Sequence, residues 1–313
     1  MSPNGFGSSE KFQVRVHGKW ILAGEHAVLR GSPAIAFPVY GKALSLSWDN
    51  TPLSGQDRPF RAEFRGDRGQ EFQLLFSGVF DRALEILGRS ADTSLKRGEF
   101  VVESTLPVGA GLGASAALSV AVGRWFQAQG LIEASRLFEF CREIENLFHG
   151  ESSGVDVAVA IENRGLLFSR GAGFEAFDPM WNPTWYISYS GARGITSECV
   201  NKVKDLIARD PALGARLDGH MREAVTMAHE SLLSTSFASG FEALAESIRL
   251  ARSCFEGWGL TGGELGLHMR WLEESGATAV KPTGSGGGGF ALSLWRERPA
   301  AEIERQLIPV FKV

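Results

Sequence analysis

A glycine-rich segment near the middle of the chain has the residue types and spacing to bind a polyphosphate. It reads Pro107-Val-Gly-Ala-Gly-Leu-Gly-Ala-Ser-Ala-Ala117. Glycines at 109, 111 and 113 allow backbone N–H groups to turn toward one point. A helix that starts directly after this loop would direct the positive end of its dipole to the same point. The segment therefore predicts an anion-binding loop, which makes phosphate chemistry the first hypothesis for function.

Two common phosphate-binding patterns do not fit this loop. No Gly-Lys-Ser/Thr follows it, so it is not a P-loop. A dinucleotide motif requires an acidic residue at the end of a strand about 20 positions on. In this chain that residue, Glu133, opens a predicted helix instead. From the spacing alone, a close-packed loop beneath a helix stays open as an alternative without a ligand.

The elements around the loop are well marked in the sequence. Residues 100–104 alternate as a strand, and residues 106–114 form the loop. Residues 115–129 then predict a helix with one buried face, made of Leu118, Ala121, Val122, Trp125 and Phe126. A strand, a glycine loop and a helix in this order would fix the direction of the loop backbone.

The rest of the chain alternates between strand and helix patterns. Strands are expected at 12–16, 20–23, 34–39, 43–48, 181–189, 277–281 and 290–295, and helices at 72–87, 134–148, 196–209, 213–232, 241–254 and 263–275. The polar stretch 49–69 predicts turns around short edge strands. This order of elements predicts an α+β protein with two lobes, 1–180 and 181–313, because Pro179 and Pro183 flank the boundary.

Composition excludes several classes of protein. Of the 313 residues, 44% are hydrophobic and 22% are charged, which is ordinary for a globular domain and unlike a disordered chain. The net charge of -4 gives no basic excess for nucleic acid or an anionic membrane. The three cysteines are widely spaced and predict reduced thiols. With no apolar leader and no run of about 18 apolar residues, we expect a cytoplasmic protein.

Two further motifs complete a recognisable set with the glycine loop. His17-Gly-Lys-Trp-Ile-Leu-Ala-Gly-Glu-His-Ala-Val-Leu-Arg-Gly31 precedes it, and Lys281-Pro-Thr-Gly-Ser-Gly-Gly-Gly-Gly289 follows it. In this order the three motifs resemble those of the GHMP kinases, the superfamily of galactokinase, homoserine kinase, mevalonate kinase and phosphomevalonate kinase. The resemblance spans about residues 12 to 295, with weak correspondence over 49–69. It implies an N-terminal lobe related to ribosomal protein S5 domain 2, a ferredoxin-like C-terminal lobe, and the use of ATP and Mg²⁺.

Within that superfamily the pattern is most similar to mevalonate kinases. The run Gly24–Gly31 followed by Pro33-Ala-Ile resembles theirs, whereas galactokinases tend to carry Thr-Asp after the Glu-His pair. A glutamate eleven residues before an aspartate, here Glu145 and Asp156, resembles their metal-binding and catalytic pair. The departures are limited: His17 and Ser152 stand where the family usually has proline, Ala114 stands in place of a serine, and Phe290 follows the glycine run. None of them removes a charged group.

The resemblance assigns catalytic and metal-binding roles to four residues. Asp156 would be the base for the substrate hydroxyl, and Lys19 would keep it ionised beside the transferring phosphate. Ser115 and Glu145 would offer Mg²⁺ hard oxygen ligands. Three of the four have a plain alternative: a helix N-cap for Asp156, a solvated strand lysine for Lys19, and a helix-surface carboxylate for Glu145.

The resemblance also implies binding residues for both substrates. Those expected at ATP are Ser104, Pro107, Gly109, Ala110, Gly111, Leu112, Gly113, Ala114 and Ser115. Those expected at the phosphate acceptor are Lys19, Glu25, His26, Asp156, Thr196, Gly286 and Gly287. The backbone of 281–289 is expected to pack against the phosphate loop.

The activity implied by the resemblance is transfer of the γ-phosphate of ATP to the 5-hydroxyl of mevalonate, in isoprenoid biosynthesis. One alternative is another GHMP kinase, acting on phosphomevalonate or a sugar. A second is a non-catalytic ligand sensor on the same fold, against which the presence of Lys19, Ser115, Glu145 and Asp156 argues. We expect a small-molecule substrate, no nucleic acid and no membrane partner, and the resemblance leaves assembly into a homodimer open.

Overall fold

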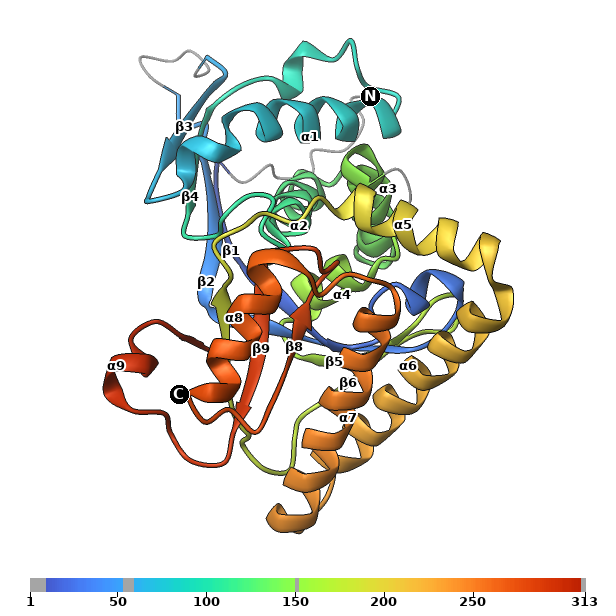
Figure 1. The fold of residues 1–313 in the computed structure, drawn as a ribbon. Helices are drawn as coiled ribbons and strands as arrows, with labels where there is room; N and C mark the ends of the chain where they lie inside the picture. Colours follow the sequence, from blue (N-terminus) through green and yellow to red (C-terminus); the bar gives the residue numbers. More distant parts are fainter. Residues whose placement is uncertain (1–9, 53–58, 150–151, 311–313) are drawn as a thin grey trace. The chain divides into compact units, whose positions relative to one another are not determined.

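The computed structural model describes residues 10–52, 59–149 and 152–310 (Figure 1). Its contacts divide the chain into two compact units. Unit 1 comprises Met1–Gly18, Lys42–Val108 and Gly113–Ile161, and unit 2 comprises Lys19–Gly41, Gly109–Leu112 and Glu162–Val313. The two-lobe boundary at residue 180 stays a prediction. Part of the predicted edge region, 53–58, lies outside the described residues.

Unit 1 combines a sheet with helices. β4 (Glu99–Ser104) pairs antiparallel with the C-terminal half of β2 (Ala34–Asp49) and parallel with β3 (Arg61–Arg65). β1 (Lys11–Ala23) also pairs with β2. The helices are α1 (Gln73–Ile86), α2 (Ala114–Ala128), α3 (Leu137–His149) and α4 (Val155–Glu162), with short 3₁₀ turns η2 (Gly69–Phe72), η3 (Thr93–Leu95) and η4 (Ala134–Arg136).

An aromatic cluster around Trp125 of α2 forms the core of unit 1. The ring of Trp125 lies 5.5 Å from that of Trp48, 5.4 Å from Phe80, 5.2 Å from Phe100 and 4.9 Å from Phe126, measured between centroids. The face of α2 predicted to be buried is buried in the structure. Because interlocking aromatic side chains pack densely, this cluster fixes α2 and with it the end of the glycine loop.

The close approach of α2 to α3 depends on Gly123. A Cβ placed there would lie 2.5 Å from the Cys141 sulfur. We therefore expect Gly123→Ala to destabilise the protein by about 1–3 kcal/mol in urea unfolding, as overpacking usually does. The matched control is Gly219→Ala in the exposed middle of α6 (Pro211–Leu232), where a Cβ meets nothing within 4 Å. That change is expected to stabilise by about 0.5–1 kcal/mol. Equal effects at the two positions would contradict the packing argument.

Unit 2 contains a second sheet and most of the helices. β7 (Thr184–Tyr189) and β9 (Phe290–Trp295) form the centre of an antiparallel sheet, with β10 (Ile308–Pro309) and β8 (Ala279–Thr283) at its edges. The hairpin β5 (Gly165–Ser169) and β6 (Gly173–Phe177) adds to the N-terminal half of β2. The remaining elements are α5 (Thr196–Arg209), α6, α7 (Phe237–Gly257), α8 (Gly263–Glu274), α9 (Ala301–Glu304) and the 3₁₀ turn η1 (Ala27–Arg30).

Packing within unit 2 supports the segment that precedes the last glycine run. The helices α6 and α7 lie along each other, as the orange part of Figure 1 shows, and α7 also packs on β8. α8 covers β8 and β9 through Leu265, Met269 and Leu272, which join Tyr186 and Val280 in one buried cluster. β8 is therefore held between helices before it enters the turn at 284–289.

Most predicted elements are confirmed, and the α+β class is confirmed with them. The helix at 196–209 and the strand at 290–295 match the structure at both ends. The predicted strand pairs 12–16 with 20–23 and 34–39 with 43–48 were wrong as separate strands, because the chain stays extended through Gly18 and Gly41. α4, β5 and β6 were missed. None of the described helices is long and apolar enough to cross a membrane.

Candidate active site

The glycine loop runs from the end of β4 to the start of α2, as predicted. Gly109, Gly111 and Gly113 have φ angles of +72°, +88° and +71°, which residues with a side chain rarely adopt. Gly113 precedes α2 and no side chain caps the helix there. A glycine at this position offers no side-chain acceptor of its own to the first N–H groups of α2, which is an arrangement that an anion can use.

Within unit 2, strand β1 and the turn after β8 hold residues 109–112 in place. The Lys19 N–H donates to the Leu112 carbonyl at 3.0 Å. A Cβ at Gly284 would lie 3.7 Å from the Gly111 Cα, and one at Gly289 would lie 3.1 Å from the Ala110 oxygen. The two glycine segments thus approach each other backbone to backbone, as expected for 281–289.

A second group in unit 2 brings His26 and Thr196 to the same turn. The His26 Nε2 lies 2.9 Å from the Ser285 carbonyl oxygen, and the Ser285 hydroxyl donates to the Thr196 hydroxyl at 3.4 Å. Since a carbonyl only accepts, Nε2 of His26 carries the hydrogen and Nδ1 is left as an acceptor. His26 also has a φ of +59°, an uncommon conformation for a residue with a side chain.

Burial keeps the His26 imidazole neutral. Its ring packs against Phe255 and Trp258, and burial lowers the pKa of His26 from 6.5 to about 4. Because the folded protein resists protonation here, the unfolded state binds more protons as pH falls below 6.5. We expect unfolding free energy to be lost progressively between pH 6.5 and about 4, at about 1.4 kcal/mol for each unit of pKa difference.

The variant His26→Gln isolates this contribution, because an amide can donate to the Ser285 carbonyl but does not titrate. Urea unfolding at about pH 7 and about pH 5 should show a smaller pH-dependent loss in the variant than in the parent, given that histidine normally titrates between these values. Identical losses would show that His26 does not carry this pH dependence.

Glu25 and Lys281 form a fully buried ion pair in unit 2. The Lys281 Nζ lies 2.5 Å from the Glu25 Oε1, and it sits 5.3 Å from the centroid of the Phe255 ring. Desolvation raises the pKa of Glu25 and lowers the pKa of Lys281, while each charge opposes the shift of the other. The charge of Lys19 also acts on Glu25, favouring the ionised carboxylate.

The side chain of Lys281 had no predicted role. The sequence did contain a signal for it, because a lysine between Val280 and Pro282 in a buried strand requires a charged partner.

In unit 1, Asp156 occupies the first turn of α4. The helix begins at Val155, so the residue before it is Gly154. The hydroxyls of Ser152 and Ser153 accept from the N–H groups of Gly154 and Val155 at 3.2 and 3.4 Å. These serines serve the start of the helix, which argues against the N-cap alternative for Asp156. The carboxylate is half-buried, near the positive end of the helix dipole.

The predicted metal ligands also lie in unit 1. Glu145 of α3 is 1% exposed, so the alternative of a helix-surface carboxylate was wrong. Ser115 is half-buried at the second position of α2. A carboxylate and a hydroxyl are hard oxygen donors, and Mg²⁺ takes few protein ligands because it keeps phosphates and waters. The chemistry of this donor set fits Mg²⁺.

Ser104 shapes the entry to the glycine loop. It is buried at the end of β4, and its hydroxyl accepts from the Leu106 N–H at 3.0 Å. This contact turns the chain where the strand ends, which is a role that the sequence did not indicate.

The predicted site residues fall in both units. Unit 1 carries Ser104, Pro107, Gly113, Ala114, Ser115, Glu145 and Asp156, and unit 2 carries Lys19, Glu25, His26, Gly109, Ala110, Gly111, Leu112, Thr196, Gly286 and Gly287. Gly286 and Gly287 lie in the turn that contacts α5, where the Gly286 carbonyl accepts from the Cys199 thiol. Of the residues predicted to bind the acceptor, His26, Thr196, Gly286 and Gly287 thus lie in or beside the turn at 284–289.

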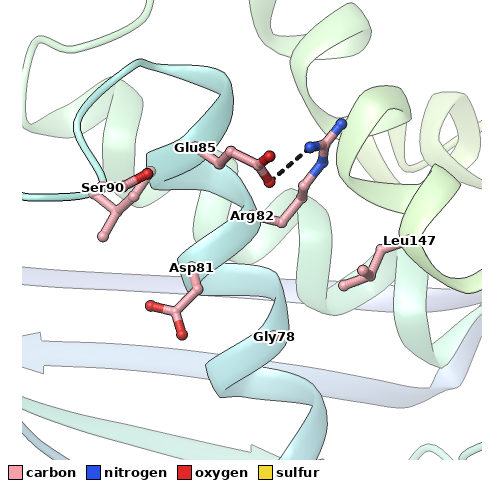
Figure 2. Close-up of a pocket in the computed structure, with 7 residues that line it drawn as sticks. Gly78, Asp81, Arg82, Glu85, Ser90 and Leu147 are labelled. Atoms are coloured by element: carbon pink, nitrogen blue, oxygen red, sulfur yellow. Dashed lines mark hydrogen bonds and ion pairs between the residues drawn. The ribbon is translucent and has the colours of Figure 1, made fainter.

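Figure 2 shows a surface hollow in unit 1 that involves none of these residues. It is lined by Gly78, Asp81, Arg82, Leu84, Glu85, Ser90 and Leu147. Arg82 and Glu85 pair across one turn of α1 at 2.7 Å. The glycine loop and the buried polar groups, rather than this hollow, are the candidate active site.

Comparison with known proteins agrees with the fold and the loop. Residues 77–164, which include the glycine loop, match the family model of the GHMP kinases N terminal domain. Together with the relatives and solved structures below, this match supports an ATP-dependent small-molecule kinase of the GHMP type. The resemblance predicted from the three motifs is confirmed.

Within this family the chain is similar to mevalonate kinases. The mevalonate kinase of Pyrococcus horikoshii is 29% identical over 302 residues, covering 90% of this chain and 89% of the relative. The structure of L. major mevalonate kinase in complex with R-mevalonate aligns with a TM-score of 0.73 at 20% identity, covering 95% and 91% of the two chains. Lactococcus lactis galactokinase complexed with galactose aligns with a TM-score of 0.70 at 15% identity, covering 93% and 87%.

Proposed function

We propose that this chain phosphorylates the 5-hydroxyl of mevalonate with ATP, in isoprenoid biosynthesis. The observation that carries the proposal is similarity over 90% of the chain to relatives named mevalonate kinase. The fold does not choose the acceptor, since a galactokinase structure aligns almost as well as a mevalonate kinase structure. The sequence relatives therefore decide between acceptors.

In this proposal the chain's charged groups handle the proton and the developing charge. Asp156 accepts the proton of the acceptor hydroxyl. At the same time the hydroxyl oxygen bonds to the γ-phosphorus of ATP, and the bond between the γ-phosphorus and ADP breaks. Lys19 is proposed to supply positive charge to the transferring phosphate. Mg²⁺, when bound through Ser115 and Glu145, neutralises phosphate charge. Phosphoryl transfer needs mainly such positioning and charge neutralisation.

The nucleotide phosphates are proposed to bind the backbone of 109–113 and the start of α2, with Ser104, Pro107, Ala114 and Ser115 around them. The positive φ angles of the three glycines and the uncapped helix support this. Such a site binds anions through backbone N–H groups, so it does not need a basic protein surface.

Within unit 2, the acceptor is proposed to bind at Lys19, Glu25, His26, Thr196 and the backbone of Gly286 and Gly287. The neutral His26 supports this, because its Nδ1 can accept from a hydroxyl while Nε2 stays engaged with Ser285. The Thr196 hydroxyl belongs to the same hydrogen-bonded group.

We also propose a cytoplasmic location. The three cysteines are buried and unbonded to one another, and burial raises the pKa of the Cys254 thiol to about 12, which suits stable reduced thiols. The resemblance leaves assembly into a homodimer open, and molecular mass in solution tests it.

An acceptor panel tests the substrate assignment. ADP release is followed with mevalonate, phosphomevalonate, galactose and homoserine at saturating ATP. Mevalonate is expected to give the highest kcat/KM, because the pattern over Gly24–Gly31 and the sequence relatives both indicate it. A clear preference for a sugar would favour the second candidate, a sugar kinase, to which the galactokinase alignment points. A chain that binds ATP but phosphorylates no acceptor would instead support a sensor.

A further inference from the structure

A short turn before α1 places an acidic side chain against the start of the glycine loop. The Glu71 Oε2 accepts from the Val108 N–H at 2.9 Å, and Val108 directly precedes Gly109. This contact joins positions 37 residues apart in unit 1. Neither the glycine motif nor its family resemblance predicted a role for this turn.

The turn is itself anchored to the end of β4. The Arg68 N–H donates to the Ser104 carbonyl at 3.2 Å. Gly66 has a φ of +80°, and a Cβ there would lie 2.9 Å from the same Ser104 oxygen. The following 3₁₀ turn η2 leads directly into α1, so the backbone that carries Glu71 is fixed at both ends.

A carboxylate beside an anion-binding loop is electrostatically unfavourable unless its charge is balanced. The Arg68 guanidinium pairs with the other oxygen, Oε1 of Glu71, at 2.8 Å. One carboxylate oxygen thus holds the loop while the other is neutralised. This arrangement uses Glu71 as a hydrogen-bond acceptor rather than as a charge.

We propose that Glu71 is a positioning residue for nucleotide binding, which fixes the direction of the loop backbone at Gly109 by holding the Val108 N–H. The proposal rests on the proposed function in one respect, that the loop binds the phosphates of ATP. Without Glu71 the Val108 N–H is free to turn, and the loop must be ordered at the expense of binding free energy.

Two substitutions separate the role of Glu71 as a hydrogen-bond acceptor from the role of its charge. Glu71→Ala removes the hydrogen-bond acceptor of Val108, whereas Glu71→Gln keeps an amide oxygen for Val108 and loses the charge together with the second acceptor oxygen that Arg68 uses. A hydrogen bond to a charged partner contributes more than one between neutral groups. We expect Mg·ATP Kd, measured by calorimetry without acceptor, to rise about tenfold in the alanine variant, which corresponds to about 1.4 kcal/mol. We expect the Mg·ATP Kd of the glutamine variant to stay within about threefold of the parent value. The KM for the phosphate acceptor should be unchanged in both variants.

The matched control is Glu85→Ala, which removes the ion pair with Arg82, also three residues away (Figure 2). It should leave Mg·ATP affinity unchanged. Parental affinity in Glu71→Ala would overturn the proposal, as would a glutamine variant that is as weak as the alanine variant or an equal loss in the control. Since no acceptor is present in the binding measurement, a wrong acceptor assignment leaves its result unchanged and appears only in the substrate panel.

Discussion

Replacing Asp156 with asparagine is expected to lower kcat by at least about 10²-fold, because general bases typically contribute about 10²–10⁴-fold. Asparagine keeps the size of the side chain and much of its hydrogen bonding but cannot take the hydroxyl proton. The start of α4 is served by the hydroxyls of Ser152 and Ser153, so the helix should form normally in the variant. Nucleotide Kd is therefore expected to change far less than kcat.

Thermal stability, nucleotide Kd and kcat measured on one preparation test this. A matched control is Glu264→Gln, which removes a carboxylate from the first turn of α8 and should cost only the dipole interaction, about 0.3–1 kcal/mol. A stable asparagine variant with near-parental kcat would falsify the base assignment and reopen the sensor alternative. A large loss of stability with unchanged kcat per folded molecule would show that Asp156 supports α4 instead.

Sequence periodicity predicted the parts of the site that depend on local structure. The loop at 106–114 and the buried face of α2 follow from neighbouring residues, because glycine spacing and a 3.6-residue period are local signals. The same holds for α5, which begins at Thr196 as predicted. α4 was missed since it has eight residues, mostly apolar, and shows little contrast between its faces.

Contacts between distant positions could not be predicted in this way. Lys281 meets Glu25 across 256 residues, and His26 meets Ser285 across 259. Each sequence segment shows only that a charged or polar residue lies among apolar ones. Many other residues of the chain could pair or hydrogen-bond with such a residue. The contact between Glu71 and Val108 is another example, because its segment resembles an ordinary polar turn.

Lys281→Met is expected to destabilise the protein by about 3–5 kcal/mol, the range found when one partner of a buried ion pair is removed. The remaining Glu25 carboxylate would be 3% exposed and would lose its ammonium partner. Its other oxygen, Oε2, is already buried without a hydrogen-bond partner among the described residues. Methionine nearly matches the length of lysine, so the effect should come from the charge rather than from a cavity.

The pH dependence of this variant has a definite sign. Without Lys281, desolvation is opposed by fewer charges and the folded-state pKa of Glu25 rises further above its ordinary value. The folded variant then binds more protons than the unfolded chain between the ordinary pKa of Glu25 and its raised folded-state pKa. The stability of the variant therefore falls as pH rises between these two values. The difference from the parent should be smallest in mild acid and largest at neutral pH in urea unfolding.

A second substitution tests whether the unpaired charge is the cause. In Lys281→Met with Glu25→Gln neither charge of the pair remains, and replacing a whole buried ion pair is often close to neutral. The double variant should therefore recover part of the loss, although an amide still has to be buried. The control Lys96→Met breaks an exposed pair with Asp81 and should cost no more than about 1 kcal/mol. Two outcomes would show that the two charges do not depend on each other. One is a loss of stability in Lys281→Met no larger than in Lys96→Met. The other is a loss in the double variant equal to the sum of the losses in Lys281→Met and Glu25→Gln. The Glu25 carboxylate would then be stabilised by its other neighbours rather than by Lys281.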